Sequence, residues 1–378
     1  AKAYHMPILT SAVRVFALRL PISAYQSIQT AYISRRMDFK RFFFSTIIGT
    51  LVSAVVGIAM ALQGYGVWAL IAQYLTNTII DTLFLAVTVR WHPRLMFSWK
   101  AAKPMIRYGG KVMMTDLLGT VCNNLGDFII GAKYTSADLA YYTKGKQLPT
   151  LIKSNIYTSL ISVLFPGMSK INDEGEKVKA LSRKSIRVLT YIIYPLMTGL
   201  LVVAEPLTIF LYTEKWIAMV PFVWVVCIEA IFSVPGTITL QSVKAMGYSD
   251  KMLKAEIFKK PILILSIIIA MQYGVMAIAL TLPLNTLLEF VINGVMAHKT
   301  VDYSIREQLW DCLPATIMSV LMGAGVLLVA HLPLGLGTIA LLFVEILVGM
   351  VIYVLLSVIT RNEEFMALAS MAKQYLKR

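Results

Sequence analysis

The chain has 378 residues, of which 58% are hydrophobic and only 15% are charged, and its mean hydropathy is +0.71. Soluble domains normally carry about 25% charged residues, so this composition excludes an ordinary soluble protein. The apolar residues recur in blocks of about 20, which is the length that a helix needs to cross a bilayer. The sequence therefore predicts an all-α polytopic membrane protein.

About eleven transmembrane helices are expected, from the apolar blocks and from the aromatic and basic residues near their ends. They are expected at residues 8–33, 42–63, 66–89, 112–132, 138–166, 188–211, 220–243, 255–272, 274–297, 312–331 and 336–359. The connections after the odd-numbered helices are long or basic, whereas the other connections are short turns.

The basic residues test this topology, because Lys and Arg collect on the cytoplasmic side of a membrane protein. Of the 35 Lys and Arg residues, 27 fall on the side of the long connections and 3 on the opposite side. The first side is therefore assigned to the cytoplasm, and the net charge of +15 reflects topology rather than a nucleic-acid-binding surface. The remaining five lie inside expected helices: Arg14, Arg19, Lys144, Lys146 and Lys153.

The helix expected over 138–166 has the length of a membrane span but carries three lysines. At helical spacing, one stripe of it holds Lys146, Thr150, Lys153 and Tyr157. A lysine at the bilayer centre costs on the order of 3 kcal/mol, so the stripe is expected to face a wet interior. It is interpreted as the polar wall of a transport cavity that accepts an anion. The alternative is an interfacial helix whose lysines reach the lipid headgroups.

The sequence also repeats itself across roughly 210 residues. The matching segments are SIQT at 27–30 with TLQS at 239–242, and YGV at 65–67 with YGV at 273–275. The match pairs the first three helices with the seventh to ninth, so the repeat unit has six helices and both copies share one membrane orientation. On this interpretation three helices are missing before Ala1, and the last two helices are additional. The paired glutamines, Gln29 and Gln241, are candidates for the cavity wall.

Several runs of residues resemble the polysaccharide transporter (PST, Wzx-type) flippase family of the MOP exporter superfamily. They include RRMDFKR (35–41), GYGVWALIAQ (64–73), ADLAYYTKGKQLPTLI (137–152), VLFPGMSK (163–170) and KAMGYSD (244–250). The resemblance covers essentially the whole chain. It implies a bundle of fourteen helices, in two six-helix lobes plus two trailing helices, of which this N-terminally incomplete chain would hold helices 4 to 14.

That arrangement gives the expected domains. Residues 1–91 would form the second half of the first lobe, 92–300 the complete second lobe, and 301–378 the two trailing helices with a cytoplasmic tail.

The resemblance implies a flippase of the bacterial inner membrane. Its substrate would be undecaprenyl-diphosphate-linked oligosaccharide repeat units of O-antigen, colanic acid or exopolysaccharide, moved by alternating access between the lobes. Implied partners are membrane lipids and a polysaccharide polymerase or assembly machinery. The sequence does not specify which glycan is carried.

A diphosphate needs cations and hydrogen-bonding groups in a hydrated cavity. The expected cavity residues are Lys146, Lys153, Arg19, Arg14, Lys144, Asn123, Asn124, Asp127, Thr150, Tyr157, Gln29 and Gln241. Asn123 and Asp127 share a helix face, where they are expected to bond sugar hydroxyls or, for Asp127, to pair with a lysine of the next helix. Interhelical hydrogen bonding is the alternative for these two residues. An interfacial position is the alternative for Arg14 and Lys144.

Other functions remain open on the sequence. A multidrug or cation exporter of the same superfamily would need acidic rather than basic cavity residues. A glycan polymerase or ligase would need a large outer loop or a catalytic carboxylate pair, and a non-transporting component of an assembly complex is a further alternative. Three cysteines and four histidines show no ligand spacing, and no catalytic or Walker-type motif is present, so neither an enzyme nor a cofactor is expected. The coupling ion, H⁺ or Na⁺, is left unassigned.

Overall fold

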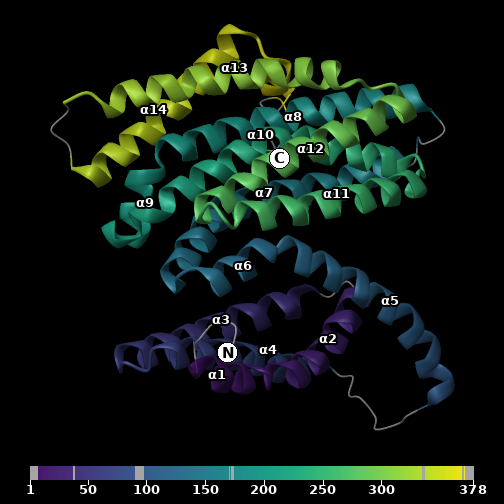
Figure 1. Cartoon of the computed structure of the whole chain (residues 1–378), viewed down its shortest axis with the longest axis vertical. Helices are drawn as coiled ribbons and strands as arrows, with labels where there is room; N and C mark the ends of the chain where they lie inside the picture. Colours follow the sequence, from purple (N-terminus) through teal and green to yellow (C-terminus); the bar gives the residue numbers. More distant parts are fainter. Residues whose placement is uncertain are drawn as a thin grey trace. The chain divides into compact units, whose positions relative to one another are not determined.

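The computed structural model describes residues 7–36, 39–89, 98–169, 171, 174–333, 337–367 and 370, and within these ranges it contains helices and no strand. The helices are α1 (Ile8–Phe16), α2 (Arg19–Arg36), α3 (Phe39–Leu62), α4 (Val67–Thr88), α5 (Trp99–Asn123), α6 (Leu125–Lys133), α7 (Ser136–Ser169), α8 (Gly175–Val202), α9 (Ala204–Tyr212), α10 (Val220–Ala245), α11 (Ser249–Ala270), α12 (Val275–Val301), α13 (Ile305–Ala330) and α14 (Thr338–Ile359). A 3-10 helix, Glu214–Met219, precedes α10. The all-α prediction is confirmed (Figure 1).

Eight of the eleven expected spans are helices long and apolar enough to cross a membrane, counted over the described residues. The other three correspond to α5–α6, α7 and α11, which are also helical. Charged side chains make these three less apolar: α7, for example, carries Lys144, Lys146 and Lys153. All eleven expected spans are therefore helical, and eight of them are long and apolar enough to cross a membrane.

Three of the expected spans are broken by a non-helical residue or turn. The first divides into α1 and α2, so that Pro21 lies in the first turn of α2, where its missing N–H removes no helical hydrogen bond. The fourth divides at Asn124, whose backbone angles of φ −104° and ψ 11° are not helical. The Asn124 side-chain amide donates to the carbonyl of Thr120 at 2.8 Å, a local bond that competes with continued helix. The sixth divides into α8 and α9 at Val203, whose backbone angles of φ −89° and ψ 10° are not helical.

The chain divides into two compact units, Ala1–Thr115 and Asp116–Arg378. The division expected at residue 91 falls among residues outside those described. In the first unit α4 packs against α2 and α3. The helices α3 and α4 approach closely because Gly49 has no side chain: a Cβ there would lie 2.0 Å from Asp81 Oδ1. Asp81 is buried beside the hydroxyl of Ser45.

In the second unit α10 is the central helix and packs against α7, α8 and α12. Pro235 lies inside α10 and cannot donate a hydrogen bond to the carbonyl of Ile231. The hydroxyl of Tyr194, on α8, donates to that carbonyl at 2.6 Å instead. The proline is therefore accommodated by a neighbouring helix, as membrane helices require.

The trailing helices α13 and α14 pack on each other and on α8, as Figure 1 shows in yellow and green. Hydroxyl groups join α8 to α14. Tyr191 and Ser357 share a hydrogen bond of 2.9 Å, and the Tyr353 hydroxyl donates to the carbonyl of Tyr191 at 2.8 Å.

The two Tyr-Gly-Val segments of the sequence repeat each place a glycine with positive φ directly before a helix. Gly66 immediately precedes α4 with φ 52°, and Gly274 immediately precedes α12 with φ 109°. Both angles lie in the region that favours glycine, so in both segments the chain enters the helix through a conformation that glycine adopts readily. The series α2–α3–α4 thus corresponds to α10–α11–α12.

Candidate functional site

The first polar pair of the lysine stripe joins α7 to α6. Lys146 Nζ lies 2.8 Å from Asp127 Oδ1, and its ammonium lies 4.2 Å from the centre of the Tyr142 ring. The side chains of Lys146 and Asp127 are 21% and 23% exposed. The predicted pairing of Asp127 with a lysine of the next helix is confirmed.

The second pair joins α7 to α10 and is more buried. Lys153 forms an ion pair and hydrogen bond with Glu229 Oε2, and each side chain is 14% exposed. The other carboxylate oxygen of Glu229 accepts a hydrogen bond of 3.1 Å from the hydroxyl of Thr286, on α12. Glu229 therefore connects three helices of the second unit through polar contacts.

The stripe continues one turn further along α7. Tyr157 shares a hydrogen bond of 3.0 Å with Ser233, on α10. Thr150, between the two lysines, is exposed. Both lysines therefore direct their ammonium groups to carboxylates of α6 and α10, and the four charges of the two pairs cancel. This pairing has a physical cause, because an unpaired charge in an apolar interior is strongly unfavourable.

Two candidate arginines lie in the first unit. The Arg19 guanidinium donates from Nε to the hydroxyl of Thr78 at 2.9 Å and lies over the rings of Phe16 and Tyr74. Arg14, on α1, is exposed. The structure therefore holds Arg19 in position through an aromatic and hydroxyl pocket and leaves Arg14 on the surface of its unit.

Three further candidates lie near the start of the second unit. Lys144 donates to Gln147 Oε1 at 3.0 Å, on the same helix. Asn123 lines a small cavity of 130 Å³ together with Tyr142 and Glu289, whereas Asn124 bonds its own helix as described above. Asn123 therefore lies near the Lys146–Asp127 pair, because the Tyr142 ring that Lys146 contacts lines the same cavity as Asn123.

The paired glutamines of the repeat differ in their surroundings. Gln29 is completely buried in α2, and neither polar atom of its side chain has a hydrogen-bond partner among the described residues. Gln241 is half-buried near the end of α10. Among the described residues, no group of His, Cys, Asp and Glu side chains could hold a metal ion.

Comparison with known proteins identifies the family. The model of the family described as "Polysaccharide biosynthesis protein" matches residues 1–221. The chain belongs to this family.

Relatives in other organisms agree with this assignment. The chain is 21% identical over 235 residues to the succinoglycan biosynthesis transport protein ExoT of Rhizobium meliloti, covering 62% of this chain and 48% of ExoT. It is 23% identical over 300 residues to the lipopolysaccharide biosynthesis protein WzxC of Escherichia coli, covering 77% of this chain and 59% of WzxC. The chain spans about half the length of the curated relatives it matches.

A solved structure has the same fold. The lipid II flippase MurJ, in an inward closed conformation, superposes with a TM-score of 0.73 at 15% identity, covering 93% of this chain and 74% of MurJ. The chain therefore shares the fold of that structure. This member of the polysaccharide biosynthesis family is a multi-pass protein of the bacterial inner membrane.

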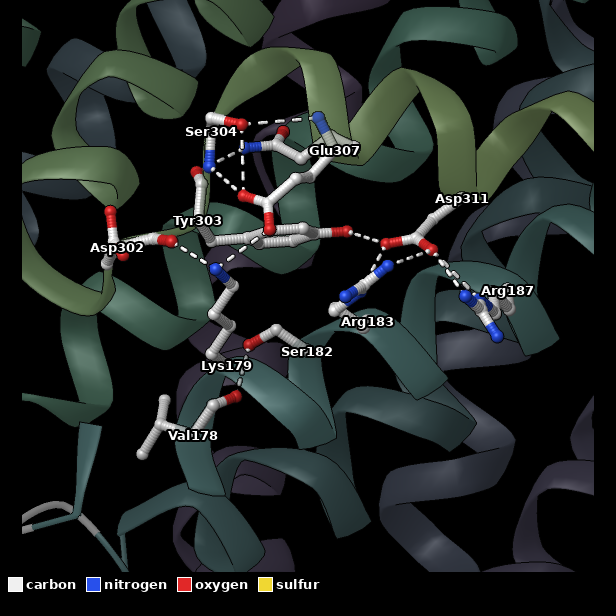
Figure 2. A network of polar contacts seen from close by, with 11 residues as sticks. Val178, Lys179, Ser182, Arg183, Arg187, Asp302, Tyr303, Ser304, Glu307 and Asp311 are labelled. Carbon is white, nitrogen blue, oxygen red and sulfur yellow. Dashed lines mark hydrogen bonds and ion pairs between the residues drawn. The ribbon is translucent and has the colours of Figure 1, made fainter. Parts of the chain in front are cut away.

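A second polar network in this family member was not anticipated from the sequence, and Figure 2 shows it. Arg183 and Arg187, one turn apart on α8, both bind the carboxylate of Asp311, on α13. The Tyr303 hydroxyl donates to the same carboxylate at 2.9 Å. Burial and the negative charge of Asp311 raise the pKa of Tyr303, so that this hydroxyl keeps its proton at neutral pH.

The start of α13 completes this network. Ser304 and Glu307 form a capping box, in which the Ser304 N–H donates to Glu307 Oε2 at 2.8 Å. Lys179, on α8, lies 2.8 Å from the other oxygen of that carboxylate. The network therefore fixes the start of α13 against α8. Its sequence signal is the one-turn spacing of Arg183 and Arg187, which are two of the basic residues on the side assigned to the cytoplasm.

Proposed function

We propose that this protein is a flippase that moves undecaprenyl-diphosphate-linked oligosaccharides across the inner membrane. The relatives whose names state a role include a transport protein and, in Haloferax volcanii, a probable glycan biosynthesis flippase. These names describe the relatives. For this chain they favour transport over catalysis, and we propose that it has no enzymatic activity.

The observation that carries the proposal is the pair of lysines in α7. Lys146 and Lys153 are two turns apart on one side of a helix that packs against α10. A membrane protein tolerates such cations only with a counterion or an anionic ligand. The diphosphate of a lipid-linked saccharide is a ligand of that kind, and charge-assisted hydrogen bonds from two ammonium groups would bind it.

Neighbouring side-chain amides are suited to bind the saccharide of the same ligand. The side-chain amide of Asn123 lies beside the cavity near Tyr142, and Asn285 lines the same cavity. Amide groups offer both donors and acceptors to sugar hydroxyls. The repeated helix series α2–α3–α4 and α10–α11–α12 supports alternating access, in which two similar lobes move against each other. Polysaccharide polymerases or other assembly proteins are the proposed acceptors of the product.

The proposal is tested by complementation in a strain from which the complete gene has been deleted. The double variant Lys146→Ala/Lys153→Ala of the complete gene product should abolish surface glycan while the protein still reaches the membrane. Full export by a well-expressed double variant would overturn the cavity assignment.

A matched control is available in the same unit. Lys215 is an exposed lysine beyond α9. Lys215→Ala should leave surface glycan at the wild-type level, which separates loss of a particular cation from loss of positive charge in general.

A further inference from the structure

The two lysine pairs are electrically neutral, which raises the question of how an anion is bound. Asp127 and Glu229 form ion pairs with the ammonium groups of Lys146 and Lys153. A diphosphate that is esterified at both ends brings a negative charge on each phosphate. If both carboxylates stayed ionised, the ligand would enter a site with no net positive charge. At least one carboxylate must therefore be displaced and neutralised for tight binding.

We infer that Lys153–Glu229 is a counterion switch, in which the diphosphate displaces Glu229 from Lys153 and the released Glu229 takes up a proton. This inference rests on the proposed function. The proton comes from water: the Glu229 carboxylate and one hydronium ion give the carboxylic acid and one water molecule. The ammonium of Lys153 keeps its own protons and exchanges a carboxylate oxygen for a phosphate oxygen.

Glu229 suits this role better than Asp127 because of what holds each lysine. Lys146 is held over the Tyr142 ring as well as by Asp127. Lys153 has Glu229 as its hydrogen-bond and ion-pair partner among the described residues. The Lys153–Glu229 pair is thus the one whose lysine is free to turn to a ligand once the carboxylate leaves.

The surroundings of Glu229 favour its neutral form after release. Its side chain is only 14% exposed, and burial disfavours a charged carboxylate that has lost its cation. The hydroxyl of Thr286, which donates to the carboxylate at 3.1 Å, can also accept a hydrogen bond from the protonated acid.

The other titratable groups that face Glu229 do not replace the lysine. They are Tyr157 on α7, Cys227 on α10 and Glu289 on α12, each close enough to interact electrostatically with Glu229. None of the three is a cation that could pair with Glu229 after it leaves Lys153. Once Glu229 has been displaced from Lys153, protonation is therefore the means of neutralising its carboxylate.

The test is isothermal titration calorimetry of the complete protein in detergent. The probe is a synthetic farnesyl diphosphate with one hexose on its second phosphate, which has no group titrating near neutral pH. Titrations in HEPES and in Tris at the same pH give the number of protons exchanged on binding. Wild-type protein should take up roughly one proton per bound probe, and Glu229→Gln should take up almost none.

The variant Glu289→Gln tests the competing carboxyl and should still take up roughly one proton. Equal uptake by wild type and Glu229→Gln, or loss of uptake in Glu289→Gln alone, would overturn the inference. The wild-type protein gives a second measurement that needs no variant. Because a proton is taken up, its Kd for the probe should rise with pH, by up to about tenfold per unit; a Kd independent of pH would also overturn the switch.

These failures differ from failure of the proposed function. If wild-type protein does not bind the probe, or Lys146→Ala/Lys153→Ala binds it equally well, the diphosphate site itself is wrong and the switch falls with it. If binding depends on both lysines but no proton is exchanged, only the switch is wrong.

Discussion

Replacing Asp311 by Asn should destabilise the second unit more than any other single carboxyl-to-amide change at its helix ends. The Asp311 side chain is 1% exposed and binds two guanidinium groups and one phenol. Arg183 contributes two hydrogen bonds, of 2.8 and 3.1 Å. Asn keeps the shape of the side chain but loses the charge and directs an N–H₂ donor toward donors. The change therefore removes the common partner of α8 and α13.

The size of the effect follows from burial. Breaking a buried ion pair by removing one partner costs about 3–5 kcal/mol. Since Arg183 and Arg187 are 37% and 41% exposed, water compensates part of their loss and the lower end of that range applies. For a protein of this size, about 3 kcal/mol corresponds to a fall in Tm of roughly 4 °C.

The assay is thermal unfolding of the purified protein, followed by size-exclusion chromatography after heating. Asp302→Asn is the matched control, because the Asp302 side chain is 85% exposed and Asn also tolerates its left-handed backbone, φ 52°. The control should shift Tm by less than about 2 °C. A Tm for Asp311→Asn within that same range would refute the claim that this network locks α8 to α13.

Two further predictions concern the packing and bonding of α10. Gly145→Ala places a Cβ 2.6 Å from Phe222 Cβ and 2.7 Å from the Met219 carbonyl oxygen, so it should cost about 1–3 kcal/mol of stability. Gly109→Ala is the control and should not destabilise the protein, because nothing lies within 4 Å of the added Cβ. Equal Tm values for the two variants would contradict this packing. Tyr194→Phe removes the donor to the Ile231 carbonyl and should cost about 1 kcal/mol, but less in a Pro235→Ala background, where the helical N–H returns. The same cost in both backgrounds, measured by a double-mutant cycle in thermal unfolding, would show that Tyr194 does not compensate for the proline.

The fold was largely predictable because membrane helices are specified by simple physical properties. Apolar length and the distribution of Lys and Arg gave the helices and their order, and the two Tyr-Gly-Val segments gave the repeat. The breaks before Arg19, at Asn124 and at Val203 were not predicted. Each depends on one or two residues within a long apolar block, where averaged hydropathy has no resolution.

The candidate site was predictable only in part. The stripe of Lys146 and Lys153 follows from helical spacing, and its pairing with Asp127 was one of two alternatives for a residue on the adjacent helix. Glu229 was not predicted as the partner of Lys153, because spacing within α10 does not reveal which face of α7 it meets. Asp311 was missed for a related reason. It directly precedes the helix expected over 312–331, where an isolated charge is ordinary, and its importance comes from arginines 124 and 128 residues away.

The most direct test of the central claim is translocation by the complete protein in liposomes. A fluorescent farnesyl-diphosphate saccharide would be placed in both leaflets, and the outer-leaflet fraction would be followed by a membrane-impermeant quencher. The wild-type protein is expected to exchange the probe between leaflets. Lys146→Ala/Lys153→Ala should reduce this exchange to the rate of protein-free liposomes, while Lys215→Ala should not. Exchange by the double variant at the wild-type rate would contradict a role for the α7 lysines in moving a lipid-linked diphosphate.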